Sequence, residues 1–201
     1  VDLPGHGRAR GITFDVLSRA AARVGESAPA GATLCGWSLG GLVALTLATI
    51  SPSRVAKVVL MGTSPCFVQR DDWLPAMPSE AFEAFRTSLA ADRPRTLKRF
   101  AGLVAQGGDE PRGRLRELSD AMARSDATDE GLSAGLDALA SVDARSALAM
   151  VAQPALVIHG ENDSLVPVAA ARWLATRVNR GLTPARLEII QKAGHAPFLD
   201  E

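Results

Sequence analysis

The sequence of 201 residues, 47% of them apolar, is long enough to bury the core of one globular domain. Its 22 basic and 22 acidic side chains cancel, which argues against nucleic acid as a partner. The two cysteines, Cys35 and Cys66, cannot build a disulfide framework, and no apolar run reaches the roughly 18 residues that span a membrane, so we expect a reduced, cytoplasmic protein without a membrane partner.

The chain opens with the pattern of a strand end over residues 1–3, followed by a Pro-Gly turn at 4–5. A helix is predicted over 12–24. Its apolar residues recur at helical spacing, at Ile12, Val16, Ala20 and Val24. Because a strand end comes first, we expect further strands upstream of Val1, and we expect a closing helix after Glu201.

The next segment predicts a strand, a sharp turn and a helix over 32–45. At the turn, Ser38 stands between Gly36 and Gly40 in a Gly-x-Ser-x-Gly pattern. This spacing is typical of a nucleophile elbow, in which small neighbours let the strand and the helix approach each other and the hydroxyl is exposed. The turn also aims the backbone N–H of Leu39 at the oxyanion that forms after attack. Ser38 is therefore the candidate nucleophile, and Leu39 a candidate oxyanion donor.

Alternating strands and helices follow the elbow. We expect strands over 55–61, 154–160 and 186–190, and a helix over 168–178. The strands are almost continuously apolar, which is typical of a parallel sheet buried on both faces. The predicted fold class is therefore α/β, with a mostly parallel sheet flanked by helices.

Between residues 66 and 150 the pattern contains no strand and changes to helical periods. Four helices are expected there, over 79–91, 93–106, 111–124 and 129–140. Helices inserted between sheet strands are typical of a cap over an active site. We therefore expect a core of residues 1–65 and 151–201 and a helical cap of residues 66–150. A separate second domain is the alternative, but sheet-like segments flank the insertion on both sides.

A serine nucleophile needs an imidazole to accept its proton and a carboxylate to orient that imidazole. In an α/β sheet these groups collect on loops after the carboxyl ends of strands, and the order that goes with this elbow is serine, acid, histidine. Asp163 follows the strand at 154–160, and His195 follows the strand at 186–190. Ser38, Asp163 and His195 are therefore the predicted catalytic residues.

Three other residues compete for these roles. Glu161 shares a loop with Asp163 but lies nearer the strand, where a solvated side chain is the simpler interpretation. His159 falls on the strand end and is better explained as a structural histidine, and His6 in its Pro-Gly turn as a packing residue. No metal or nucleotide motif competes, so we expect neither a metal nor a cofactor.

Several motifs resemble those of the α/β-hydrolase superfamily: Asp2-Leu3-Pro4-Gly5-His6-Gly7, the serine elbow, the loop Gly160-x-x-Asp163-x-x-Val166-Pro167 and Gly194-His195. Within it, the chain is similar to the family of biotin-synthesis esterases that cleave the methyl ester of pimeloyl-[acyl-carrier protein]. This similarity runs along essentially the whole chain and is carried by Gly36-Trp37-Ser38-Leu39-Gly40-Gly41, Ser64-Pro65-Cys66-Phe67, Arg99-Phe100, Val142-Asp143-x-Arg145 and Ala196-Pro197-Phe198.

The resemblance implies a serine carboxylesterase that uses Ser38, Asp163 and His195. It implies that Leu39 supplies one oxyanion N–H and that a second donor lies upstream of Val1. Substrate contacts are expected from Ser38, Leu39, His195, Phe100, Ala101, Gly102, Leu103 and Val104. The implied partner is an acyl-carrier protein bearing the substrate, and we expect a monomer.

Four cap arginines have the spacing of helix faces. Arg95 and Arg99 are four residues apart on one predicted helix, and Arg112 and Arg116 are four apart on the next. On spacing alone, a solvated face explains them equally well. Because acyl-carrier proteins are strongly acidic, the resemblance implies that these arginines dock the carrier.

Two alternatives stay open. The same fold and catalytic residues also serve small-ester esterases, lactonases, C–C bond hydrolases and perhydrolases, since a fold does not determine a function. A non-catalytic ligand-binding module is the alternative from another class, although the presence of Ser38, Asp163 and His195 argues against it.

Overall fold

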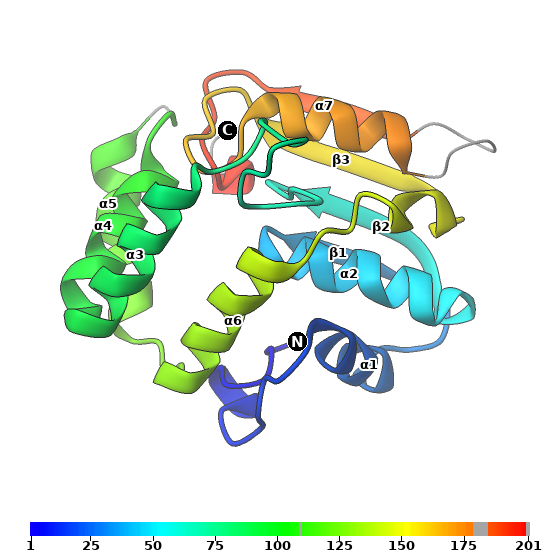
Figure 1. Ribbon diagram of the computed structural model, residues 1–201, viewed down its shortest axis with the longest axis horizontal. Coiled ribbons are helices and arrows are strands. Elements are labelled where there is room, and N and C mark those ends of the chain that lie inside the picture. Colours follow the sequence, from blue (N-terminus) through cyan, green and yellow to red (C-terminus); the bar gives the residue numbers. More distant parts are fainter. Residues whose placement is uncertain (109, 179–184, 200–201) are drawn as a thin grey trace.

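The computed structural model describes residues 1–108, 110–178 and 185–199. Its centre is one sheet of parallel strands in the order β1-β2-β3-β4 (Figure 1), comprising Ala32–Trp37, Val55–Met61, Ala155–Gly160 and Arg186–Ile190. The register places Val59 between Cys35 on β1 and Leu156 on β3. The predicted parallel α/β sheet is therefore confirmed.

Three helices pack around this sheet: α1 (Leu17–Ser27), α2 (Leu39–Ile50) and α7 (Val168–Arg177). Helix α2 packs on α1, β1 and β2, and α7 packs on β3 and β4. Helix α2 is apolar on nearly all sides, so it lies in the centre of the main core. Its residues Leu42 and Leu47 belong to the same buried cluster as Leu60, Val157 and Leu174. Within the described ranges, no helix combines the length and the hydropathy needed to cross a bilayer.

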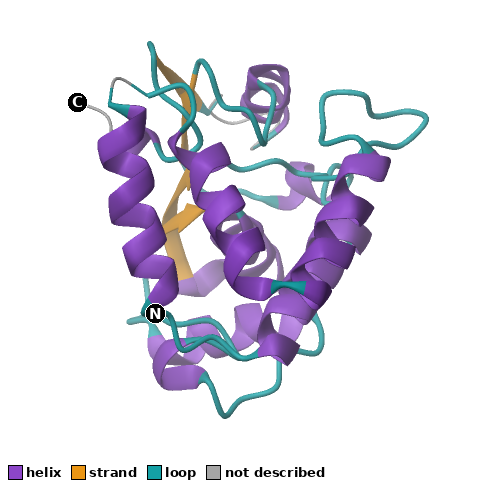
Figure 2. Cartoon of the chain, turned by 90° about the vertical axis from the view of Figure 1, so that its left-hand side faces the viewer, coloured by secondary structure: helices purple, strands orange, loops and turns teal. Residues whose placement is uncertain are grey.

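Four more helices connect β2 to β3: α3 (Ser79–Ala91), α4 (Arg93–Ala105), α5 (Pro111–Ala123) and α6 (Asp129–Ser141). They agree with the predicted ranges to within one residue. In Figure 1, α3, α4 and α5 stand together beside the sheet, with α6 between them and the core. Figure 2 shows this helical layer from its own side, with the orange strands behind it.

The starts of α4 and α6 follow from their sequences. The side chain of Asp92 accepts the N–H of Arg95 at 3.1 Å, and the Thr128 hydroxyl accepts the N–H of Gly131 at 3.0 Å, so each helix has a side-chain N-cap. The N–H of Thr128 in turn donates to the carbonyl oxygen of Gly5 at 2.8 Å. This bond fastens the start of α6 to the N-terminal turn of the core.

The N-terminal predictions are partly wrong. Residues 1–3 form no strand, because no described strand pairs with them. The first helix begins at Leu17, since Phe14 enters the core from an extended segment. The buried face of α1 carries Leu17, Ala20 and Ala21, so Val16, which we had placed on that face, is half exposed.

A polar cluster holds the segment after α6 against the loop that precedes α3. Arg145 contacts Asp143 at 2.6 Å and Asp72 at 3.0 Å. The hydrogen bonds from the Arg145 guanidinium lower the pKa of the Asp143 carboxyl, although partial burial acts in the opposite direction. Backbone contact between Cys66 and Asp143 closes the same junction, so the two ends of the segment that carries α3 to α6 lie side by side.

Candidate active site

Ser38 forms the turn between β1 and α2, and its backbone has φ 52° and ψ −117°, a region that L-residues avoid. Its N–H donates to the carbonyl oxygen of Met61 on β2 at 2.9 Å, which holds the turn in this conformation. Ser38 is also the N-cap residue of α2, so the N–H of Leu39 belongs to the first turn and has no intrahelical acceptor. This amide and the positive end of the helix favour a negatively charged oxygen beside Ser38.

The close approach of α2 to β1 and to the loop after β2 requires glycine at two positions. A Cβ on Gly36 would clash with the carbonyl group of Gly40, and a Cβ on Gly41 would clash with the Thr63 side chain. Gly40 differs from the prediction, because a Cβ there would meet no atom within 4 Å. Among the described residues, the small neighbours that the elbow needs are therefore Gly36 and Gly41.

Asp163 and His195 lie on adjacent loops and are in direct contact. Their loops follow β3 and β4, which are parallel neighbours, so both loops leave the same edge of the sheet. The Nδ1 atom of His195 lies 2.8 Å from Oδ2 of Asp163, and both side chains are buried. Since a carboxylate only accepts, Nδ1 carries the hydrogen and donates it.

The remaining ring nitrogen of His195, Nε2, is buried and has no hydrogen-bond partner among the described residues, Ser38 included. Trp37, which precedes Ser38, donates its Nε1–H to the carbonyl oxygen of His195 at 2.8 Å, and the two rings lie 5.5 Å apart. The elbow and the His195 loop are thus joined directly. Nε2 is the nitrogen that stays available to a serine hydroxyl.

The three competing residues each contact a backbone group, and His159 also lies against the candidate site, with Nε2 3.3 Å from Oδ2 of Asp163. Glu161 is exposed, and its carboxylate lies 3.5 Å from the N–H of Lys192. Nδ1 of His6 lies 2.9 Å from the carbonyl oxygen of Pro4. His159 is fully buried, and this burial lowers its pKa because the charged ring would lose its hydration.

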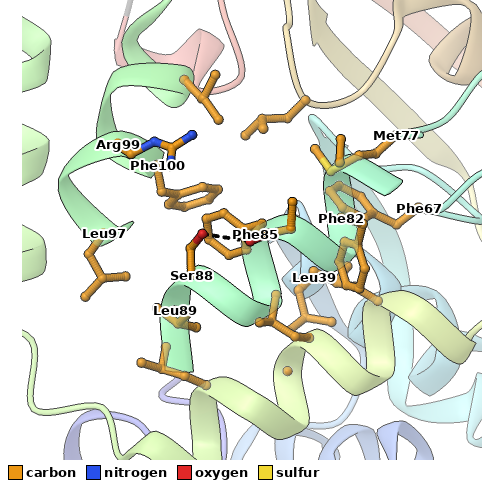
Figure 3. Close-up of a pocket in the computed structure, with 18 of the residues that line it drawn as sticks. Leu39, Phe67, Met77, Phe82, Phe85, Ser88, Leu89, Leu97, Arg99 and Phe100 are labelled. Carbon is orange, nitrogen blue, oxygen red and sulfur yellow. Dashed lines mark hydrogen bonds between the residues drawn. The ribbon is translucent and has the colours of Figure 1, made fainter. Parts of the chain in front are cut away.

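An apolar cavity of about 450 Å³ lies between the helical layer and the elbow. Figure 3 shows its wall, to which α3, α4 and α6 contribute together with Phe67 and Met77. The cavity reaches the elbow at Leu39 and the Asp163 loop at Leu165, whereas Ser38 and His195 are not among its lining residues. Such a lining suits an extended hydrocarbon chain.

The expected cap contacts are met only in part. Phe100 and Leu103 line the cavity, but Ala101, Gly102 and Val104 do not. The reason is that α4 presents one face to the cavity: Ala101 is buried, Val104 packs with Leu165 and Ala196, and Gly102 faces Leu115 on α5. The cavity wall therefore includes part of the range on α4 that we expect to contact substrate, and the contacts themselves stay a prediction.

Sequence reasoning missed the larger part of the cavity wall. On α3 and α6 this part comprises Phe82, Phe85, Ser88, Leu89, Leu132, Leu136 and Leu139. The apolar members recur at helical spacing, which indicates a buried face. That signal does not distinguish a face that packs on protein from a face that lines a cavity.

The helical layer also contacts the loop that carries Asp163. The Ser164 hydroxyl donates to the carbonyl oxygen of Leu103 at 3.0 Å, and the Asn162 side-chain amide donates to the carbonyl oxygen of Gly107 at 3.3 Å. Leu103 on α4 and Gly107 in the turn after α4 are thus bonded to the residues on both sides of Asp163. Two hydrogen bonds therefore join the helical layer to the candidate catalytic loop.

The four predicted docking arginines, Arg95, Arg99, Arg112 and Arg116, are all exposed. Within the described part of the chain none of them forms an ion pair, whereas Arg86 on α3, Arg93 on α4 and Arg114 on α5 pair with carboxylates. Arg99 also lines the cavity, so its side chain stands where the cavity meets the surface of α4 (Figure 3).

We also considered whether side chains that bind metals lie together in the described residues. In the described residues, no group of three or more histidine, cysteine, aspartate or glutamate side chains could hold a metal ion.

Comparison with known proteins defines the class. The model of the alpha/beta hydrolase fold family matches residues 1–201, and the chain belongs to this family. An esterase from Exiguobacterium antarcticum has a similar structure, with a TM-score of 0.85 and 28% identity over 98% of this chain and 74% of that one.

Two curated relatives are more similar in sequence. One, from Nitrosomonas europaea, is 40% identical over 200 residues, which cover 99% of this chain and 78% of the relative. The other, from Aromatoleum aromaticum, is 44% identical over 205 residues, which cover 98% of this chain and 79% of the relative. Both are named pimeloyl-[acyl-carrier protein] methyl ester esterase.

Proposed function

We propose that the chain is a serine carboxylesterase that hydrolyses the methyl ester of pimeloyl-[acyl-carrier protein], freeing the pimeloyl carboxylate for biotin synthesis. The observation that carries the proposal is the identity of 40% and 44% with two esterases of this name along almost the entire chain. The strained serine elbow, the buried Asp163–His195 pair and the apolar cavity beside them suit this reaction.

In the first half of the reaction, Oγ of Ser38 attacks the ester carbonyl carbon while Nε2 of His195 accepts the hydroxyl proton. The resulting oxyanion accepts a hydrogen bond from the N–H of Leu39. Asp163 holds Nδ1 of His195 and stabilises the imidazolium. The tetrahedral species then expels methanol, which takes its proton from Nε2, and leaves the acyl group on Ser38.

In the second half, water attacks the acyl-serine carbonyl while Nε2 of His195 accepts a proton from the water. Collapse of this second tetrahedral species breaks the bond to Oγ, and Nε2 returns the proton to Ser38. The products are the restored enzyme and a carboxylic acid on the carrier-bound chain, which loses its remaining proton to solvent and becomes the carboxylate. None of these steps requires a metal or an organic cofactor.

The cavity suits a pimeloyl chain. Its wall is almost entirely apolar and includes Phe85 and Phe100, whose rings lie 5.7 Å apart. A saturated acyl chain would displace water from this wall, which favours binding by about 0.8 kcal/mol per buried methylene group. In our proposal the chain extends from Leu39 past Phe100 toward Arg99.

The free arginines suit an acidic carrier. Arg95, Arg99, Arg112 and Arg116 lie on neighbouring helices, with no described carboxylate to neutralise them. An acidic carrier protein that approaches this face would be attracted before contact. We place the carrier on α4 and α5, with its substrate entering beside Arg99.

The setting we propose is a monomeric enzyme in the cytoplasm. Cys35 and Cys66 are free thiols, which suits a reducing compartment.

The proposal is tested by measuring kcat/KM for three methyl esters: pimeloyl on its carrier, free pimelate and free acetate. We expect carrier-bound pimeloyl ester to be hydrolysed at least about a hundredfold more efficiently than free pimelate ester, and acetate ester least of all. Equal values for all three would contradict the proposed substrate, and the absence of any hydrolysis would contradict the proposed chemistry.

A further inference from the structure

His159 stands at the end of β3 with its side chain fully buried. Its Nε2 lies 2.9 Å from the carbonyl oxygen of Val166 and 3.3 Å from Oδ2 of Asp163. A carbonyl oxygen only accepts, so Nε2 must carry a hydrogen. That hydrogen is donated to the Val166 carbonyl oxygen, and the same nitrogen lies in electrostatic contact with Oδ2, the oxygen that accepts the bond from His195.

Asp163 is held by three donors and by one neighbouring ring. Its Oδ1 accepts the N–H groups of Leu165 at 2.8 Å and Val166 at 2.9 Å. Its Oδ2 accepts the Nδ1–H of His195 and lies 3.3 Å from Nε2 of His159. The two backbone donors belong to the same loop as Asp163 and move with it. His159 contacts this loop from a sheet strand, through its bond to Val166.

The charge state of His159 agrees with this arrangement. Burial lowers its pKa, while the Asp163 carboxylate acts in the opposite direction and His195 reinforces the lowering. The neutral ring has its hydrogen on Nε2, and Nδ1 has no hydrogen-bond partner among the described residues. A neutral donor orients Asp163 without cancelling the negative charge that His195 needs.

We propose that His159 is a positioning residue, whose Nε2–H bond to the Val166 carbonyl ties the Asp163 loop to β3 and keeps Oδ2 of Asp163 toward Nδ1 of His195. The inference rests on the proposed function, in which Asp163 orients His195. His159 does not line the cavity, so it acts through the loop that carries Asp163.

Two variants test the donor. His159→Leu fills a similar volume without an N–H group, and His159→Gln offers an amide N–H near the place of Nε2. We expect His159→Leu to lower kcat at least about tenfold with KM within about twofold, since the hydrogen bond that ties the Asp163 loop to β3 is lost and the buried Val166 carbonyl has no donor in its place. We expect His159→Gln to recover most of that loss. An unchanged kcat in His159→Leu would overturn the proposal.

A double-substitution cycle separates positioning from general support of the fold. Added to Asp163→Asn, the His159→Leu change should lower kcat by less than about twofold, because its target is gone. The same loss in both backgrounds would mean a structural role and would overturn the proposal. If Asp163→Asn kept the activity of the unaltered enzyme, the proposed function would fail.

Proton NMR decides the inference without any activity measurement. The Nδ1 proton of His195 should give a low-field signal in the full chain, since it lies in a short bond to a carboxylate. We expect His159→Leu, or His159→Met if that variant folds better, to shift or broaden this signal, and His159→Gln to retain it. An unchanged signal in folded His159→Leu or His159→Met would contradict the proposed positioning.

Discussion

The indole Nε1 of Trp37 donates a 2.8 Å hydrogen bond to the carbonyl oxygen of His195. The residue before the elbow serine thereby holds the loop of the proposed base, although 158 positions separate the two in sequence. Two loops of a sheet would otherwise be free to shift relative to each other. A direct bond between them keeps Nε2 of His195 near the elbow, where proton transfer requires it.

The first prediction concerns the loss of this hydrogen bond. Trp37→Phe keeps an aromatic ring beside His195 but removes the donor, so kcat for a small soluble ester should fall about five- to tenfold, as expected for one lost hydrogen bond. KM should stay within about twofold, because the cavity wall is unaltered. Steady-state kinetics on p-nitrophenyl acetate provides the measurement, and an unchanged kcat would show that the bond has no role in catalysis.

The second prediction concerns the catalytic residues. Ser38→Ala and His195→Ala should each lower kcat by about five to six orders of magnitude, and Asp163→Asn by about four. Glu161→Gln is the matched control, since Glu161 shares the loop but is exposed. Loss of turnover in Glu161→Gln with normal turnover in Asp163→Asn would reverse our assignment of the carboxylate.

The third prediction concerns the packing of the elbow. Gly36→Ala would drive a methyl group into the carbonyl of Gly40, so we expect it to destabilise the fold by at least about 2 kcal/mol and to abolish activity. Gly40→Ala should leave stability unchanged or slightly higher, because its methyl group would meet open space within the described structure. Guanidinium denaturation compares the two variants. Equal destabilisation would mean that Gly40 is also required for packing.

The fourth prediction addresses the carrier. Reversal of Arg95, Arg112 and Arg116 to glutamate should raise KM for carrier-bound ester at least about tenfold, and the effect should shrink at high salt. Arg99 is left unaltered in this variant because it also lines the cavity. Hydrolysis of p-nitrophenyl acetate should stay within about twofold.

A control with the same change of charge uses Arg10, Arg23 and Lys57, which are also exposed but lie outside the helical layer. Their reversal should leave KM for the carrier-bound ester nearly unaltered. Equal effects of the two triple reversals would mean that only net charge matters. Loss of activity on both substrates would mean that the cap arginines support the fold.

The fifth prediction follows from the burial of His159. Its pKa in the folded protein lies below the usual 6.5, so below pH 6.5 the unfolded chain binds a proton that the folded protein does not. The contribution to stability is therefore complete above that pH and decreases as the pH falls toward the folded pKa, by at most about 1.4 kcal/mol per pH unit. His159→Gln lacks this titration, so its free energy of unfolding should fall less between pH 7 and 5.5. Identical slopes in denaturation experiments would exclude the effect.

The sequence predicts the sheet and the helices well, because their signals are local. The strand Val55–Met61 is a continuous apolar run between Ser-Pro and Gly-Thr-Ser, and Asp92 and Thr128 cap the helices that follow them. Loop order along the chain is also enough to select Asp163 and His195, since parallel strands bring their carboxyl ends together.

Contacts between segments that are far apart in the sequence are harder to predict. Periodicity gives α4 an apolar face, but it does not show that Phe100 and Leu103 face the cavity while Val104 packs with Leu165 and Ala196 of the loops after β3 and β4. The bond between Ser164 and Leu103 joins segments 61 positions apart, and no spacing rule predicts it. The contact of His159 with Asp163 depends on the path of the loop that follows β3, which the residue types alone do not specify.

The measurement that tests the account most directly is labelling with a fluorophosphonate probe, followed by peptide mapping in a mass spectrometer. We expect one adduct, on Oγ of Ser38, that forms much more slowly in His195→Ala and Asp163→Asn and is absent in Ser38→Ala. Undiminished labelling of Ser38→Ala, or an adduct on a different residue of the unaltered protein, would contradict the account.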